Sequence, residues 1–214
     1  MNQPLSPYKI ARKNRRRQEI LDAAAAVIAE RGYLAASMKE IAERLSMGPG
    51  SLYHYFESKE AALAAICREG SAETQAGIEA IRDAGLPARD AIRAGIIKHL
   101  RHEKRDHVEC FTFHRRNLPD PLLDELDERA RVYHRVWVSL FEQAAREDAL
   151  PAGLDCRFAA TTVLGLINGV AHSLRGRNEA TLDDFAERAA DFALAGLGAR
   201  KSAIRAAEKD TEVT

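Results

Sequence analysis

The sequence has little of several features that would indicate other classes of protein. Its three cysteines, Cys67, Cys110 and Cys156, are odd in number and far apart, which argues against a disulfide scaffold and for a reducing compartment. No apolar run approaches the roughly 20 residues that span a bilayer, and none near Met1 is typical of a secretion signal. We therefore expect a cytoplasmic protein with no membrane partner.

Sequence motifs of enzymes are equally scarce. The chain has no glycine-rich phosphate loop, no nucleophile motif and no pair of carboxylates in a recognisable catalytic setting. We therefore expect no cofactor, no resident metal and no enzymatic activity. A helical scaffold is a further alternative, but it would leave the basic N-terminal arm and the run of residues 52–60 unexplained.

Charge is balanced over the whole chain but not along it. The 32 Lys and Arg residues equal the 32 Asp and Glu residues, whereas residues 1–62 hold 10 basic side chains and only 7 acidic ones. Residues 1–17 hold six basic side chains and no acidic one. Cations at a helix N-terminus are disfavoured by the helix dipole. We therefore prefer the interpretation that Arg15 and Arg16 bind phosphate to the interpretation that they are only solvated. A basic arm on a neutral body is expected where one end of a protein contacts nucleic acid.

Apolar residues recur at helical spacing along most of the chain, and no strand-like alternation of any length occurs. The pattern predicts an all-α fold of about nine helices. The predicted helices cover residues 15–31, 37–45, 49–56, 58–81, 88–102, 107–116, 122–147, 155–175 and 182–197. Residues 1–14 and the polar tail, residues 201–214, are expected to be frayed or disordered.

Residues 37–60 carry the strongest indication of function. Ser37 is a favourable N-cap that forms a capping box with the acidic residue three positions later. Pro49 suits the first turn of a following helix. Leu52 and Phe56 lie four residues apart and can pack on the preceding helix. The rest of this short helix is rich in hydroxyl, aromatic and imidazole groups, which suit phosphates and base edges in a DNA major groove.

This segment resembles the helix-turn-helix of the TetR (tetracycline-repressor) family of transcriptional regulators. The resemblance covers residues 15–65 and is carried above all by the run LYHYF, residues 52–56, with Ser58, Lys59 and Glu60 following. The family usually has glycine where Ser46 stands, so we expect a strained turn there. The resemblance implies a homodimer that binds a palindromic double-stranded DNA operator, more often as a repressor, and responds to a small-molecule effector. With the basic arm, it gives as DNA-contacting residues Arg15, Arg16, Ser37, Lys39, Pro49, Gly50, Ser51, Tyr53, His54, Tyr55 and Lys59.

The resemblance also divides the chain. Residues 1–58 would be the arm and DNA-binding domain, residues 59–200 the ligand-binding and dimerisation domain, and residues 201–214 a polar tail. In TetR-type proteins the last two helices of each chain form a four-helix dimer interface. The small and aromatic residues expected there are Gly165, Gly169, Phe185, Ala189, Phe192 and Gly196. Each helix-interior glycine destabilises by about 1 kcal/mol, which points to close helix approach, either between chains or by tight packing within one chain.

Several polar and aromatic side chains of the second half could line an effector cavity. They are His99, Phe111, His114, Arg116, Tyr133, His134, Trp137, Asn168 and His172. Taken singly, each is more often a core or surface residue. This half also resembles a TetR subgroup associated with lipid and steroid catabolism, through the run HRRNLP, Tyr133 with Trp137, and LGLIN followed by Gly-Val-Ala-His172. The resemblance implies a hydrophobic effector, such as an acyl-CoA or a lipid-like acid.

A metal ion is the alternative effector. His107, Cys110 and His114 fall at positions i, i+3 and i+7 of one predicted helix, with His99 and His102 one helix earlier. Nitrogen and sulfur ligands at that spacing suit Zn²⁺. A histidine-rich helix pair without metal is the simpler interpretation.

Overall fold

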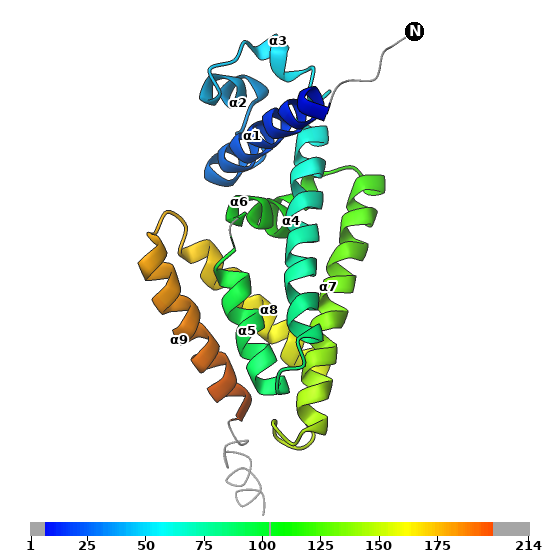
Figure 1. Cartoon of the computed structure of the whole chain (residues 1–214), viewed down its shortest axis with the longest axis vertical. Coiled ribbons are helices and arrows are strands. Elements are labelled where there is room, and N and C mark those ends of the chain that lie inside the picture. Colours follow the sequence, from blue (N-terminus) through cyan, green and yellow to red (C-terminus); the bar gives the residue numbers. More distant parts are fainter. Residues whose placement is uncertain (1–6, 103, 199–214) are drawn as a thin grey trace, which may run out of the picture.

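The computed structural model describes residues 7–102 and 104–198, and within them the chain forms nine α-helices and no strand (Figure 1). This confirms the predicted all-α fold. The helices are α1 (Pro7–Arg31), α2 (Met38–Arg44), α3 (Pro49–Leu52), α4 (Lys59–Asp83), α5 (Ala88–Leu100), α6 (Arg105–Glu109), α7 (Asp120–Arg146), α8 (Cys156–Ser173) and α9 (Glu179–Gly198). None of the helices in the described ranges is long and apolar enough to cross a membrane.

Helices α1, α2 and α3 form the head, which lies at one end of the elongated molecule, and α4 to α9 form the body (Figure 1). The head packs around apolar side chains at helical spacing. Those buried include Ile20, Ala24, Ile28, Ile41, Leu52 and Phe56. Gly32 follows α1 with a φ of +79°, which is the left-handed conformation expected of a helix C-terminal stop.

Helix α1 begins eight residues earlier than predicted, at Pro7. The expectation that residues 7–14 are disordered is therefore wrong. Proline is tolerated in the first turn of a helix, and the Ala, Arg and Lys residues that follow are good helix formers. The basic residues of this arm are consequently held on a rigid helix. Residues 1–6 and the polar tail, residues 201–214, lie outside the described residues.

Helices α2 and α3 and the turn between them have the arrangement expected of a helix-turn-helix. Oγ of Ser37 accepts a hydrogen bond from the Glu40 amide at 3.2 Å, as a helix N-cap. The Glu40 carboxylate pairs with Arg31 at 3.1 Å, instead of returning to the Ser37 amide as in a capping box. Ser46 has a φ of +52°, so the strained turn inferred from the sequence is present. Helix α3 is only one turn long and ends at Leu52, four residues earlier than predicted.

Helix α4 runs from the head into the body (Figure 1). Its N-cap is Ser58, whose Oγ accepts from the Ala61 amide at 3.1 Å. The first half of α4 buries Leu63 and Ile66 in an apolar cluster shared with the head. Its second half buries Ile78 in a separate cluster of the body. One rigid helix therefore contributes to both cores.

The segment between α6 and α7 departs from regular helix. Residues Cys110–His114 form a π-helical turn, η1, and Arg115–Asn117 form a 3₁₀ turn, η2. The sequence predicted one continuous α-helix over residues 107–116. A π-turn pairs each amide with a carbonyl five residues back, so side chains after Cys110 point in other directions than a 3.6-residue period implies. Helix α7 then begins at Asp120 and accommodates Pro121 in its first turn.

Helix α9 packs mainly against α5, and the outer faces of α8 and α9 stay uncovered in the single chain. Phe158, Phe185 and Phe192 are exposed on these helices, Phe192 to 70%. A Cβ added at Gly165 or Gly169 would meet nothing within 4 Å in the described structure. Packing within one chain therefore does not account for these glycines.

Candidate DNA-binding surface and effector site

One face of α3 and the turn after it is buried, and the other is open. Leu52 and Phe56 are buried in the head core, as their spacing predicts. Ser51, Tyr53 and His54 are exposed, and the Tyr53 side chain is 51% accessible. This leaves hydroxyl, phenol and imidazole groups free to contact another molecule, while the apolar pair fixes the orientation of the helix.

The start of α1 adds positive charge beside α3. A shallow hollow is lined by side chains of the arm together with Tyr55, which lies in the turn after α3. The residues that line it are Lys9, Arg12, Lys13, Arg15, Arg16, Glu19 and Tyr55. Ser37 and Lys39 are exposed at the N-terminus of α2, and Gly50 is exposed in α3. Phosphate contacts from such a basic surface are not sequence-specific and position a protein on DNA.

Lys59 has a role inside the head that the sequence did not indicate. Its Nζ donates hydrogen bonds to the backbone carbonyls of Tyr33 at 2.8 Å and Ala36 at 3.0 Å, and lies 4.3 Å from the centre of the Tyr33 ring. The Tyr33 hydroxyl in turn donates to Glu60 at 2.7 Å. Lys59 therefore ties the loop between α1 and α2 to the start of α4. Its contact with a DNA phosphate stays a prediction.

In the body, one predicted effector residue is the centre of a buried polar network. Nε2 of His99 lies 3.0 Å from Oδ1 of Asn168, and Nδ1 lies 2.9 Å from the Tyr133 hydroxyl. Because an amide oxygen only accepts, Nε2 donates to Asn168 and Nδ1 accepts from Tyr133. Burial lowers the pKa of His99 to about 4, so this ring is neutral near neutral pH. The network joins α5, α7 and α8.

Two small cavities lie on either side of His99. The first, of about 10 Å³, is lined by residues of α4, α5 and α7 that include Gly77, Ile78 and Tyr133. The second, of about 30 Å³, is lined by His99 and His102, by Phe113 of η1, and by Asn168 and His172 of α8, with other neighbours. Ligand pockets commonly hold about 300–1,000 Å³, so neither of these two cavities can hold such a ligand in this conformation.

Not every predicted effector residue reaches this site. Phe111 packs in the apolar cluster shared with the head. Arg116 is exposed on η2. Trp137 is fully buried in the body core beside Tyr133, with its indole N–H unpaired within the described structure. His114 is half-buried in η1, and His134 joins α7 to α8 by a 2.9 Å contact with Thr161.

Phe113 is one of the cavity residues that the sequence did not identify. Its ring lies 5.0 Å from the ring of His172, between centroids. Phe111, two residues earlier, points the other way into the apolar cluster shared with the head. The sequence offered two aromatic side chains on opposite sides of one turn, and only the packing shows which of them reaches the cavity.

The predicted ligand set His107, Cys110 and His114 is not assembled. Cys110 is buried and its thiol faces the Ala25 carbonyl at 3.7 Å. Among the residues placed by the structure, the only group of three metal-ligand side chains close together is Asp22, Glu69 and His107.

Comparison with known families agrees with this architecture. The family model described as "Bacterial regulatory proteins, tetR family" matches residues 20–66. A second, "Tetracyclin repressor-like, C-terminal domain", matches residues 85–197, which is more than half of the chain. The chain belongs to the TetR family. It is therefore a transcriptional regulator with a DNA-binding helix-turn-helix, and not an enzyme.

Relatives of this TetR-family regulator extend along most of its length. The HTH-type transcriptional repressor KstR2 of Rhodococcus jostii is 26% identical over 205 residues, which cover 86% of this chain and 92% of the relative. The structure of the ketosteroid transcriptional regulator KstR2 of Mycobacterium tuberculosis has the same fold, with a TM-score of 0.78 at 22% identity over 86% of this chain and 96% of that chain. The structure of AibR in complex with isovaleryl coenzyme A and operator DNA has a TM-score of 0.71 at 24% identity, covering 86% and 98%.

Acid should destabilise this regulator through His99. In the unfolded chain His99 takes up a proton below about pH 6.5, whereas in the folded chain its pKa is about 4. Between these values the unfolded state binds more protons, so the free energy of unfolding falls as pH falls, by at most about 1.4 kcal/mol per pH unit for this residue. Denaturant titrations across this range measure the slope. In the His99→Gln variant, the slope of the free energy of unfolding against pH should be smaller, by up to the contribution of one proton. His54→Gln, which changes an exposed histidine, should keep the parental slope. Equal slopes in the parent and both variants would contradict the assignment of the effect to His99.

Tyr53 should contribute to DNA binding without supporting the fold. We expect Tyr53→Ala to weaken operator binding by about 1–3 kcal/mol, because the exposed phenol is free to contact a base or phosphate. Fluorescence anisotropy with labelled operator measures the affinity, and thermal unfolding checks the fold. Leu86→Ala, which removes an exposed apolar side chain at the far end of the body, is the matched control. Operator affinity unchanged by Tyr53→Ala would remove this residue from the DNA surface.

Proposed function

We propose that this protein is a homodimeric repressor that binds a palindromic operator and is regulated by a hydrophobic effector, an acyl-CoA or a lipid-like acid. The observation that carries the effector proposal is His99, a buried neutral histidine hydrogen-bonded to Tyr133 and Asn168 between two cavities. Residues 1–58 would read the DNA, and residues 59–200 would bind the effector and form the dimer.

The exposed face of α8 and α9 supports the homodimer. It presents aromatic side chains at Phe158, Phe185 and Phe192, while Gly165 and Gly169 leave room for another backbone to approach. A second copy of the chain would cover this face by two-fold symmetry, so each residue contributes twice. Two heads also suit DNA, because one short helix offers too little surface for specific binding and a dimer reads two half-sites.

The chemistry around His99 supports an effector with both polar and apolar parts. Asn168 and His172 offer polar groups to the larger cavity, and Val108, Phe113 and Ala171 offer apolar surface. Two relatives have names that fit such a ligand: a fatty acid metabolism regulator protein of Bacillus subtilis, 26% identical over 154 residues, and AibR, whose structure contains isovaleryl coenzyme A.

The closed cavities suggest how an effector would act. A ligand of acyl-CoA size needs far more volume than the cavities of about 10 and 30 Å³, so it binds only where the helices that line them, α4, α5, α7 and α8 among them, move apart. Helix α4 carries the head, so a shift of α4 changes the spacing of the two heads in a dimer. The effector then acts through its greater affinity for the opened arrangement. The free energy by which the effector changes DNA binding equals the free energy by which DNA changes effector binding.

The dimer should depend on Phe192. Phe192→Glu would place a charge in the centre of the proposed interface twice, which should weaken dimerisation by more than about 2 kcal/mol. Light scattering after size-exclusion chromatography, over a dilution series, measures the dimer. Leu34→Glu replaces another exposed apolar residue, in the head, and should leave the dimer intact. A Phe192→Glu variant that dimerises as tightly as the parent would exclude this face.

Effector binding is tested by native mass spectrometry of the purified protein, followed by calorimetric titration with acyl-CoA esters and free fatty acids. We expect a dimer that binds at least one member of this panel. Asn168→Leu should weaken that binding about tenfold, because the variant lacks the amide that hydrogen-bonds near the cavity. Asn14→Leu, on the exposed side of α1, is the control. Failure of every panel member to bind would exclude the acyl-CoA and lipid class.

A further inference from the structure

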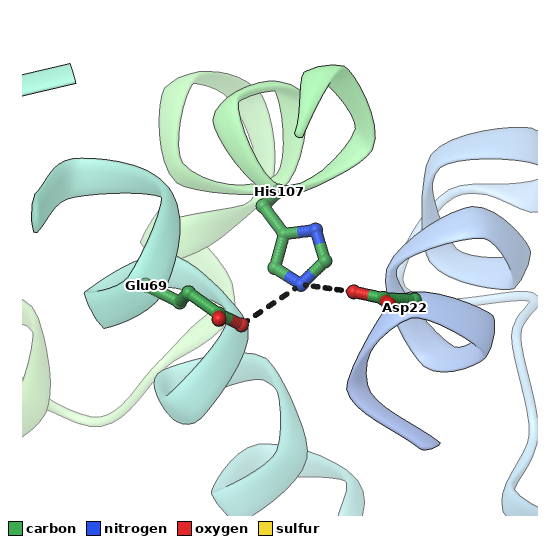
Figure 2. Close-up of side chains that lie close together, drawn as sticks. All are labelled: Asp22, Glu69 and His107. Carbon is green, nitrogen blue, oxygen red and sulfur yellow. Dashed lines mark ion pairs between the residues drawn. The ribbon is translucent and has the colours of Figure 1, made fainter. Parts of the chain in front are cut away.

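Two carboxylates and one imidazole meet where the head joins the body (Figure 2). Asp22 belongs to α1, Glu69 to α4 and His107 to α6, and their ligand atoms all lie within 4.8 Å of one another. Nε2 of His107 lies 3.2 Å from Oε2 of Glu69 and 3.4 Å from Oδ1 of Asp22. Neither the DNA surface nor the proposed effector site uses these three side chains.

His107 points a buried, unpaired nitrogen at the two carboxylates (Figure 2). Its side chain is only 3% exposed, and within the described residues Nε2 has no hydrogen-bond partner despite the short distances. Leaving such a buried polar atom unpaired costs about 1–3 kcal/mol.

The spacing of the three groups suits a metal ion. Nitrogen and oxygen ligands lie about 2.0–2.2 Å from a first-row divalent ion, so neighbouring ligands around one ion are about 3.0–3.5 Å apart. The two distances from His107 Nε2, 3.2 and 3.4 Å, fall in this range. Asp22 and His107 also line an open groove between the head and the body, from which water can enter.

The surrounding residues hold the group in place. A Cβ on Gly70 would come within 2.7 Å of the His107 backbone, so only glycine at this position lets α6 pack this closely against α4. Lys104 donates to Oε1 of Glu69, and Gln18 donates to Oε2 at 3.1 Å and to Oδ1 of Asp22 at 2.8 Å.

We propose that Asp22, Glu69 and His107 bind a divalent first-row transition-metal ion, with water from the groove completing its coordination. One imidazole and two carboxylates suit Zn²⁺, Mn²⁺ or Fe²⁺ better than Ca²⁺ or Mg²⁺, which take oxygen ligands only. The ion neutralises the paired carboxylates and satisfies Nε2. Because Asp22 lies in the head and the other two ligands lie in the body, the bound ion restrains the head relative to the body.

Zn²⁺ titration of the full-length, chelator-treated protein, followed by calorimetry in the absence of DNA and effector, tests the site. We expect one Zn²⁺ per chain. Asp22→Asn should weaken binding by about 100-fold or more, since loss of a mere outer-sphere partner already weakens metal affinity 10- to 100-fold. The Asp22 side chain is half exposed, so this variant should fold, and circular dichroism checks that it does.

Glu30→Gln is the matched control, because Glu30 is another acidic residue of α1 that lines the same groove. It should bind Zn²⁺ as the parent does, and His107→Gln should not. A parent protein that binds no Zn²⁺ would overturn the proposal. So would an Asp22→Asn variant with parental affinity, since the ion would then lie elsewhere, for instance at the partly accessible thiol of Cys156.

Discussion

The rest of the structure depends on the packing of α4, whose two halves are buried in two different apolar clusters. Its first half packs Leu63, Ile66 and Cys67 into a cluster that also contains Phe111 and Leu126 of the body. Burial of each large aliphatic side chain contributes about 1.5–3 kcal/mol. Because a close-packed interface does not deform gradually, the head follows any displacement of α4 instead of swinging freely.

Polar contacts at the rim of this packing set the orientation of the head. Arg175, in the connection between α8 and α9, donates hydrogen bonds to the Ala29 carbonyl of α1, to Glu109 at 2.8 Å and to Asp106 at 3.1 Å. Lys59 binds the loop between α1 and α2. Such charged, partly exposed contacts are individually weak and can exchange partners. In the proposed dimer, an effector or an ion would therefore need to change only a small free energy to favour another arrangement of the heads.

The two regulatory proposals act at different places along α4. His99 contacts α7 and α8 beside the second half of α4, where an effector would force the helices of the body apart. Asp22, Glu69 and His107 lie beside its first half, where an ion would hold the head to the body. Both would bias the position of the same rigid helix, so their effects on operator affinity would be thermodynamically coupled.

Sequence patterns were sufficient to predict those features of the fold that depend on residues close together in the chain. Helical periodicity gave the all-α fold, and the capping residues Ser37 and Ser58 gave the starts of two helices. The spacing of Leu52 and Phe56 gave the buried face beside α3 and so the exposed position of Tyr53. The resemblance of residues 15–65 gave the family. Each of these inferences uses patterns along the sequence and no contact between distant segments.

Tertiary structure decided everything that depends on residues far apart in the chain. Packing directed Phe111 to the apolar cluster shared with the head and Phe113 to the cavity, and it turned Cys110 towards α1 and away from the expected metal ligands. Gly70 looks like a helix-weakening residue in the sequence, yet it allows α6 to approach α4 and brings His107 to Glu69. The sequence by itself determined most of the helical segments and the family they form, since those properties arise from local preferences. Only the packing of α1, α4 and α6 determined that Asp22, Glu69 and His107 meet, because no short-range pattern encodes contacts between distant segments.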